Sequence, residues 1–211
     1  MGAFKEPHGG ELKDLYLPAD EAEAEKEAAG DYASWDLTER QLCDVELLLN
    51  GAFSPLEGFL NKDDYDSVVK SMRLKSGVLW PIPLTLDVSE DFAKELKSGD
   101  KVALRDLEGV ILATLEIGDI WTPDLDAEAK GVYGTADDKH PAVNYLKNIG
   151  NPVYLGGTLK GIEQPTHYDF KHLRDTPGEV RDRFEKLGWR KVVAFQTRNP
   201  MHRAHQELTL R

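Results

Sequence analysis

The stretch Lys191-Val-Val-Ala-Phe-Gln-Thr-Arg-Asn-Pro-Met-His-Arg-Ala-His-Gln-Glu-Leu-Thr-Leu-Arg211 decides the fold class of the end of this chain. The apolar run 192–195 predicts a strand that is buried on both faces, as in a parallel sheet covered by helices. Asn199 followed by Pro200 is a helix-start signal, which would place His202 and His205 in the first turns of a helix. A strand, a polar loop and a helix in this order indicate an α/β domain.

The residues just before this stretch predict another helix. Thr176 and Glu179 have the spacing of a capping box, with Pro177 at the first helical position. Apolar side chains then recur at helical spacing as far as Gly188, a helix-stop signal. Residues 166–211 therefore look like the first helix-strand-helix of a Rossmann-like α/β domain. One strand cannot form a sheet, so we expect this domain to be incomplete within the 211 residues.

Residues 1–165 show a different pattern and are expected to form a separate, compact α+β domain. Helices are predicted after Thr38, which pairs with Gln41 in a capping box, and after Asn61. Residues 19–30 are acidic and rich in alanine, which fits a solvated helix or a mobile excursion. Strands are predicted at 78–88, 101–106, 110–121 and 151–155, with a hairpin turn at 106–109.

The composition limits the classes of function. The net charge of -12 argues against nucleic acid as a partner, because binding to its phosphates needs clustered Lys and Arg. Cys43 is the only cysteine, which excludes an intrachain disulfide and a Cys-based zinc site and favours a reducing, cytoplasmic compartment. Its apolar helical surroundings predict a buried, inert thiol. No apolar run reaches about 18 residues, so no membrane span is expected, and the first residues lack the apolar core of a signal peptide.

The C-terminal stretch combines groups that bind anions. A helix N-terminus at the carboxyl end of a strand offers free N–H groups and a partial positive charge. His202 and His205 can donate to phosphate oxygens, Arg198 offers a fork for a tetrahedral oxyanion, and Gln196 adds an amide donor. Each residue also has a plainer interpretation: Arg198 could form a surface ion pair, and the histidines could lack a role or bind a metal, although no third ligand is evident.

Gln196-Thr-Arg-Asn-Pro-Met-His-Arg-Ala-His205 resembles the signature of the ATP sulfurylase (sulfate adenylyltransferase) family, a variant of the paired-His motif of nucleotidyltransferases. The N-terminal region is similar to the PUA-like mixed β-barrel domain of the same family, and the resemblance covers roughly residues 9–211. The matching stretches are Gly51-Ala-Phe-Ser-Pro-Leu-Glu-Gly-Phe59, Trp80-Pro-Ile-Pro-Leu-Thr-Leu86, Asp106-Leu-Glu-Gly-Val-Ile-Leu-Ala-Thr-Leu-Glu-Ile117 and Tyr133-Gly-Thr-Ala-Asp-Asp-Lys-His-Pro-Ala-Val143.

The resemblance implies a reaction in which sulfate attacks the α-phosphorus of MgATP, giving adenosine 5′-phosphosulfate and pyrophosphate. Gln196 and Arg198 would hold sulfate, and Thr197, Arg198 and Asn199 would form the catalytic segment. His202 and His205 would join residues 196–199 in contacting ATP. Mg2+ would arrive with ATP, and no protein metal ligands are implied.

The family also has a later nucleotide-binding run that contains Arg-Asp-His, and this chain has none. The resemblance thus predicts a fragment that is inactive alone, whereas the complete protein would be a homo-oligomer. Two other functions stay open. One is an adenylyltransferase of the paired-His superfamily with another acceptor. The other is a non-catalytic PUA-like binding module, which the net charge disfavours for RNA.

Overall fold

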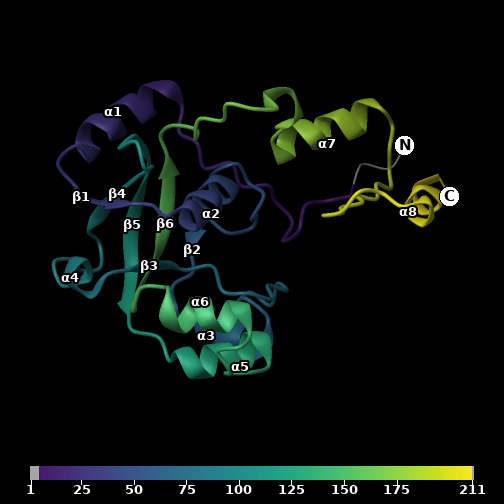
Figure 1. Ribbon diagram of the computed structural model, residues 1–211. Coiled ribbons are helices and arrows are strands. Elements are labelled where there is room, and N and C mark those ends of the chain that lie inside the picture. The colour runs from purple at the N-terminus through teal and green to yellow at the C-terminus, as the bar shows by residue number, and fades with distance from the viewer. Residues whose placement is uncertain (1–4, 211) are drawn as a thin grey trace.

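The structure is a computed structural model that describes residues 5–210, and its centre is one mixed sheet (Figure 1). The strand order is β1-β4-β5-β6-β2, and β3 also pairs with β6. β1 runs parallel to β4, and the other pairs are antiparallel. The strands are β1 (Ala33–Asp36), β2 (Gly58–Phe59), β3 (Leu86–Val88), β4 (Lys101–Arg105), β5 (Ile111–Trp121) and β6 (Val153–Gly161).

Helices flank the sheet and extend beyond it. Figure 1 shows α1 at one end of the long strands, α3, α5 and α6 gathered at the other end, and α7 and α8 to one side, away from the sheet. The helices are α1 (Ala19–Ala29), α2 (Glu39–Leu49), α3 (Lys62–Ser71), α4 (Glu90–Ala93), α5 (Leu125–Tyr133), α6 (Pro141–Asn148), α7 (Pro177–Lys186) and α8 (Arg203–Leu210), with a 3-10 turn at Lys171–Leu173. Within the described residues, none of them is long and apolar enough to cross a membrane.

Several local signals of the sequence are confirmed. Thr38 and Thr176 each form the expected capping box, at the starts of α2 and α7. β4 and β5 form the predicted hairpin, and the Asp106 carboxylate accepts from the backbone N–H groups of Glu108 and Val110 within its turn. Gly109 has a φ of 87°, a conformation that glycine adopts without a steric cost.

The hydrophobic core lies between the sheet and the helices that pack on it. α2 contributes the fully buried Val45, Leu48 and Leu49, and the central strands contribute buried apolar residues from both faces. β2 can cross close to β6 because Gly58 has no side chain, since a Cβ atom there would overlap the carbonyl oxygen of Gly157.

The N-terminal segment, residues 5–16, crosses the molecule and contacts several elements. Its Leu15 N–H donates to the Leu49 carbonyl, 2.9 Å away, and the Leu15 carbonyl accepts from the Gly161 N–H at 2.8 Å. At its other end, the carbonyl of Lys5 accepts from Arg181 of α7 at 2.5 Å. The segment therefore ties the sheet to the helix that follows it.

Two sequence-based expectations about the N-terminal region are wrong. The predicted strand 78–88 is reduced to β3, because Pro81 and Pro83 have no N–H to donate to a strand ladder. Residues 79–85 form an irregular loop instead, which we call the proline loop. Cys43 is exposed, not buried, because α2 turns its apolar side chains inward on the opposite face.

Candidate functional site

The C-terminal motif has a later helix start than the sequence predicts. α8 begins at Arg203, so Asn199 and Pro200 precede the helix and do not cap it. His202 lies immediately before the first helical residue, and its carbonyl accepts from the N–H groups of His205 and Gln206 at 2.9 and 3.1 Å. The His205 side chain stabilises this later start, because its Nδ1 accepts a hydrogen bond from the backbone N–H of His202.

The two histidines of the motif lie together. The backbone N–H of His202 donates to Nδ1 of His205 at 3.2 Å, and the two rings stack with centroids 5.1 Å apart. A nitrogen that accepts a hydrogen bond carries no proton, so the neutral His205 ring has its hydrogen on Nε2. This Nε2–H is the group that His205 can offer to a phosphate oxygen.

The residues between the apolar run and the histidines form a tight turn. The Thr197 hydroxyl accepts from the Asn199 N–H at 3.2 Å and donates to the Asn199 carbonyl at 2.9 Å. Arg198 is exposed, and no carboxylate of the described residues forms an ion pair with it. The structure thus groups Thr197 with Asn199 and His202 with His205, whereas the side chains of Gln196 and Arg198 form no hydrogen bond or ion pair with other described residues.

The predicted strand at 191–195 is absent from the described structure, although the helices on both sides of it form. A strand needs a neighbour for its backbone N–H and C=O groups, and none of the six strands lies beside this run. Its apolar side chains are consequently open to solvent, with Val193 93% exposed. An apolar run this exposed is expected to pack against further protein.

We expect backbone amides at 190–210 to exchange hydrogen with solvent much faster than those of the β4–β5 hairpin. The run at 191–195 makes no ladder bonds, whereas the hairpin is paired along both strands and borders the core. Hydrogen–deuterium exchange read by mass spectrometry measures the two regions in one experiment. Equal protection of both regions would contradict this expectation.

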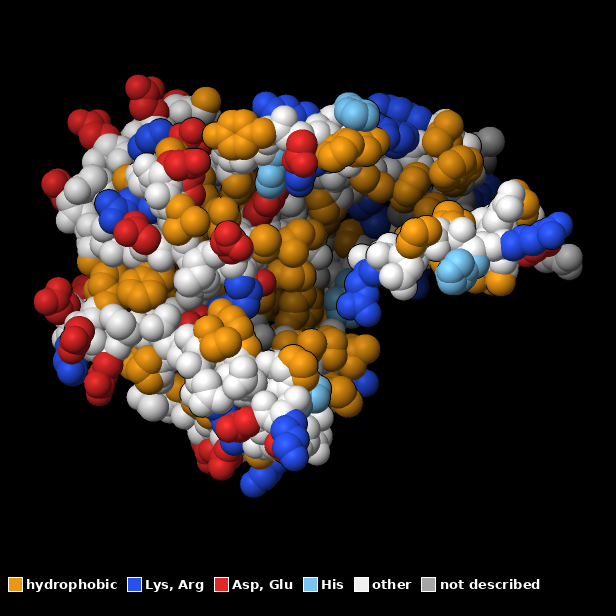
Figure 2. Space-filling view, viewed as in Figure 1, with side chains coloured by type: hydrophobic (Ala, Val, Ile, Leu, Met, Phe, Trp, Pro, Cys, Tyr) orange, Lys and Arg blue, Asp and Glu red, His pale blue; other side chains and the backbone are white. Residues whose placement is uncertain are grey.

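A separate cavity of about 610 Å³ lies in the N-terminal region, remote in sequence from the motif. Its walls come from α2, α5, α6 and the proline loop, and Figure 2 shows apolar side chains gathered on this concave side of the molecule, beneath the projecting C-terminal segment. The described residues contain no cluster of His, Cys, Asp or Glu arranged to hold a metal ion, either here or at the motif.

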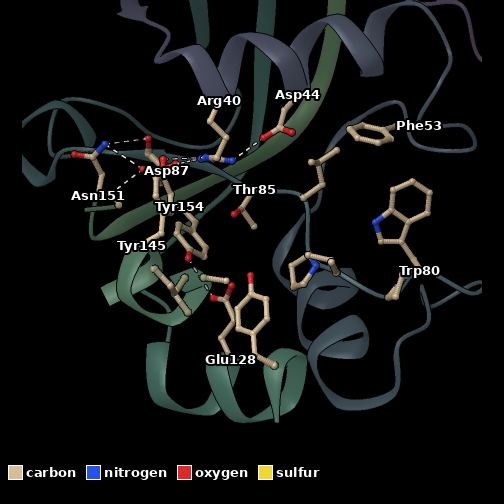
Figure 3. Close-up of a pocket in the computed structure, with 18 of the residues that line it drawn as sticks. Arg40, Asp44, Phe53, Trp80, Thr85, Asp87, Glu128, Tyr145, Asn151 and Tyr154 are labelled. Carbon is tan, nitrogen blue, oxygen red and sulfur yellow. Dashed lines mark hydrogen bonds and ion pairs between the residues drawn. The ribbon is translucent and has the colours of Figure 1, made fainter. Parts of the chain in front are cut away.

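Arg40 organises the charged wall of this cavity (Figure 3). Its guanidinium donates to Asp44 at 2.6 Å, to Asp87, and to the Tyr145 hydroxyl at 3.0 Å. Asp87 also accepts from the backbone N–H of Asn151 at 2.8 Å. Burial raises the pKa of Asp44, although the positive charge of Arg40 opposes that change. Three N–H groups of the Arg40 guanidinium are therefore engaged within the wall, two of them with carboxylates.

Glu128 lies across the cavity from Arg40, on α5, and is only 5% exposed. One of its carboxylate oxygens accepts from the Tyr65 hydroxyl at 2.7 Å and from the Tyr154 hydroxyl at 3.1 Å. Burial raises the pKa of Glu128 above its ordinary value, and the two phenol hydrogen bonds offset only part of that rise.

The raised pKa of Glu128 should make the parent protein less stable as the pH rises. Replacing Glu128 with glutamine is expected to abolish this decrease. Because the folded-state pKa of Glu128 is raised, the folded protein holds a proton that the unfolded chain releases near the ordinary value of 4.5. The contribution of this group to the free energy of unfolding therefore falls as the pH rises above that value. In urea denaturation, the free energy of unfolding of Glu128→Gln, relative to that of the parent protein, should increase from weakly acidic to neutral pH. Glu108→Gln, at an exposed position, is the control. If the relative free energy of unfolding increases no more for Glu128→Gln than for Glu108→Gln, the expectation is contradicted.

The sequence did not predict this second site. Arg40, Asp87 and Glu128 come from three elements far apart in the chain, and each alone looks like a surface charge of a helix or strand. The one available signal was the pair of prolines in 79–85, which argued against a continuous strand. Glu128 lies between the predicted strands 110–121 and 151–155, where no motif indicated a site.

Comparison with known protein families divides the chain into two matches. Residues 5–164 match the family described as PUA-like domain, and residues 171–211 match the family described as ATP-sulfurylase. The resemblance to ATP sulfurylases predicted from the motifs is confirmed, as are the mixed sheet and the PUA-like class of the N-terminal region.

Curated relatives of this chain are sulfate adenylyltransferases. That of Eremothecium gossypii is 50% identical over 206 residues, which are 97% of this chain and 41% of the relative. That of Saccharomyces cerevisiae is 49% identical over 97% of this chain and 40% of the relative, and that of Aspergillus fumigatus is 53% identical over 97% and 36%. The chain thus spans about two-fifths of the length of the relatives it matches.

A solved structure has the same fold over almost the whole chain. It is the hexameric APS kinase from Thiobacillus denitrificans, and it superposes with a TM-score of 0.78 at 35% identity. The match covers 97% of this chain and 36% of that one.

Proposed function

We propose that this chain, which belongs to the PUA-like domain family, supplies the PUA-like domain and the sulfate-binding motif of a sulfate adenylyltransferase. The observation that carries the proposal is the complete motif at 196–205, in a chain that is 50% identical to such an enzyme over 206 residues. We divide the chain into a PUA-like domain, 1–165, and the start of the adenylyltransferase domain, 166–211.

The proposed reaction forms one bond and breaks one. A sulfate oxygen attacks the α-phosphorus of ATP, the bond from that phosphorus to the bridging oxygen breaks, and pyrophosphate leaves with the electron pair. Sulfate is a weak nucleophile, so positioning and neutralisation of charge supply most of the rate. Mg2+ enters bound to the ATP phosphates and neutralises part of their charge.

The described geometry supports a division of roles within the motif. Arg198 is free to engage sulfate with two parallel N–H bonds, and the Gln196 amide adds a donor beside it. The turn between Thr197 and Asn199 fixes the backbone on both sides of Arg198. His205 offers its Nε2–H, and His202 its ring donor, to the ATP phosphates and to the oxygen that leaves with pyrophosphate.

Assembly and compartment are parts of the same proposal. The similar structure from Thiobacillus denitrificans is a hexamer, which supports a homo-oligomer here as well. The single cysteine supports a reducing compartment, which we take to be the cytoplasm. A role in sulfate assimilation follows if the enzyme runs in the direction that consumes ATP.

A chimaeric enzyme tests the proposed function. Residues 1–211 would replace the matching part of the Eremothecium gossypii relative, and sulfate-dependent exchange of pyrophosphate into ATP would be measured. We expect exchange by the chimaera and little or none by the 211 residues alone. A folded chimaera, verified by cooperative thermal unfolding, that shows no exchange would overturn the proposal. Exchange that does not need sulfate would indicate a different acceptor.

A further inference from the structure

The cavity between α2, α5, α6 and the proline loop has the size and lining of a small-molecule site. Its volume of about 610 Å³ lies within the range of roughly 300–1,000 Å³ that ligand pockets occupy. Aromatic and apolar side chains make up most of its wall, and Phe53 and Trp80 meet edge to face with ring centres 6.0 Å apart. The motif at 196–205 contributes no residue to it, so the cavity is distinct from the proposed sulfate site.

Two polar groups in the cavity wall are left without partners. Thr85 is only 9% exposed, its hydroxyl forms no hydrogen bond with any described residue, and Figure 3 shows this side chain facing the cavity. Glu128 uses one carboxylate oxygen for both of its phenol partners, and no described residue donates to the other. The Thr85 hydroxyl and this second Glu128 oxygen are therefore available to a molecule that enters the cavity.

The charged groups of the cavity wall favour a positively charged ligand. Asp44, Asp87 and Glu128 supply three carboxyl groups against one guanidinium, and Arg40 is already bonded to two of those carboxylates and to Tyr145. His8, at the rim, is engaged with the Leu79 carbonyl at 2.7 Å. Glu128 has no cationic partner among the described residues, so a bound anion would meet an uncompensated carboxylate, whereas a cation would find that carboxylate and aromatic faces.

We propose that this cavity binds a small organic cation that has a protonated amine and an aromatic or other apolar body. The ammonium donates to the free oxygen of Glu128 and to the Thr85 hydroxyl. The apolar body packs against Trp80 and Phe53, near the open side of the cavity. The site rests on the side chains of the N-terminal region alone, so it does not depend on the proposed sulfate chemistry.

Three probes of nearly equal shape test the charge requirement on the 211-residue chain. They are 2-phenylethylamine, neutral 2-phenylethanol and anionic 3-phenylpropanoate, with binding followed by calorimetry and by NMR shifts of the cavity amides. We expect saturable binding of the amine, affinity for the alcohol about tenfold lower, and the weakest binding for the carboxylate. Equal binding of the amine and the alcohol, tighter binding of the carboxylate, or no saturable binding of the amine would each overturn the proposal.

Variants then locate the bound probe. Glu128→Gln keeps the shape of the side chain and removes its charge, so it should lower the affinity for the amine about tenfold and leave that for the alcohol unchanged. Trp80→Leu, at a partly exposed position, should lower the affinity for both the amine and the alcohol. Trp189→Leu, in the C-terminal segment, should leave both affinities unchanged. An amine affinity that Glu128→Gln and Trp80→Leu both leave unchanged would place the probe elsewhere and refute the assignment.

Discussion

Replacing Arg198 with lysine is expected to lower the sulfate-dependent turnover of the chimaeric enzyme roughly a hundredfold, a loss of about 3 kcal/mol of transition-state stabilisation. A guanidinium can hold two sulfate oxygens with parallel N–H bonds, but an ammonium acts as a single point donor. The turn that Thr197 and Asn199 form around Arg198 limits how far the backbone can move to compensate for a different side chain.

Steady-state kinetics with sulfate and ATP varied separately would measure this effect. The loss should appear with sulfate, and the KM for ATP should change less. Arg190→Lys is the matched control, because Arg190 is exposed and lies outside the motif, and it should keep parental turnover. Near-parental turnover of Arg198→Lys at subsaturating sulfate would show that Arg198 does not hold sulfate.

Replacing His205 with alanine is expected to cost on the order of a hundredfold in kcat, because a donor to the charge that develops on the leaving pyrophosphate is lost. His205 also accepts from the His202 N–H, so alanine removes a structural bond as well. Two other substitutions separate these roles. Asparagine places an acceptor where Nδ1 lies, and glutamine places a donor where Nε2 lies.

If phosphate contact is the role of His205, His205→Gln should recover part of the activity and His205→Asn should resemble alanine. The opposite order would assign His205 to stabilising the start of α8 instead. Gln206→Ala, at the next residue of the same helix, is the control for general damage to α8 and should retain activity. These assays vary ATP at saturating sulfate, because the proposed contact is with the nucleotide.

The sequence predicted those parts of the fold that depend on neighbouring residues. Both capping boxes and the 106–109 turn need only a few adjacent side chains, and all of them form. The strand at 191–195 failed because a strand depends on a partner elsewhere in the protein, which no apolar pattern can supply. Cys43 was misplaced for a related reason. A helix of mixed composition does not reveal which of its faces will meet the sheet.

The same distinction applies to the two candidate sites. The motif at 196–205 is contiguous, so its residue types and spacing alone were enough to identify it. Its geometry was less predictable, because the helix starts only at Arg203, after a His202 N–H that donates to His205. The cavity was not predicted at all, since its charged residues are brought together by the folding of α2, β3 and α5.

The path of residues 5–16 has a practical consequence for protein engineering. This segment donates to the end of α2, accepts from the end of β6 and, through Lys5, contacts α7. A segment with so many contacts and no regular structure of its own suits fragment complementation. A synthetic peptide of residues 5–16, added in trans to a protein that begins at Leu17, should re-associate and restore the thermal stability that the shortened protein lacks. A fluorescent label on that peptide would then detect its binding to the shortened protein, and so the state in which the segment contacts both the sheet and α7.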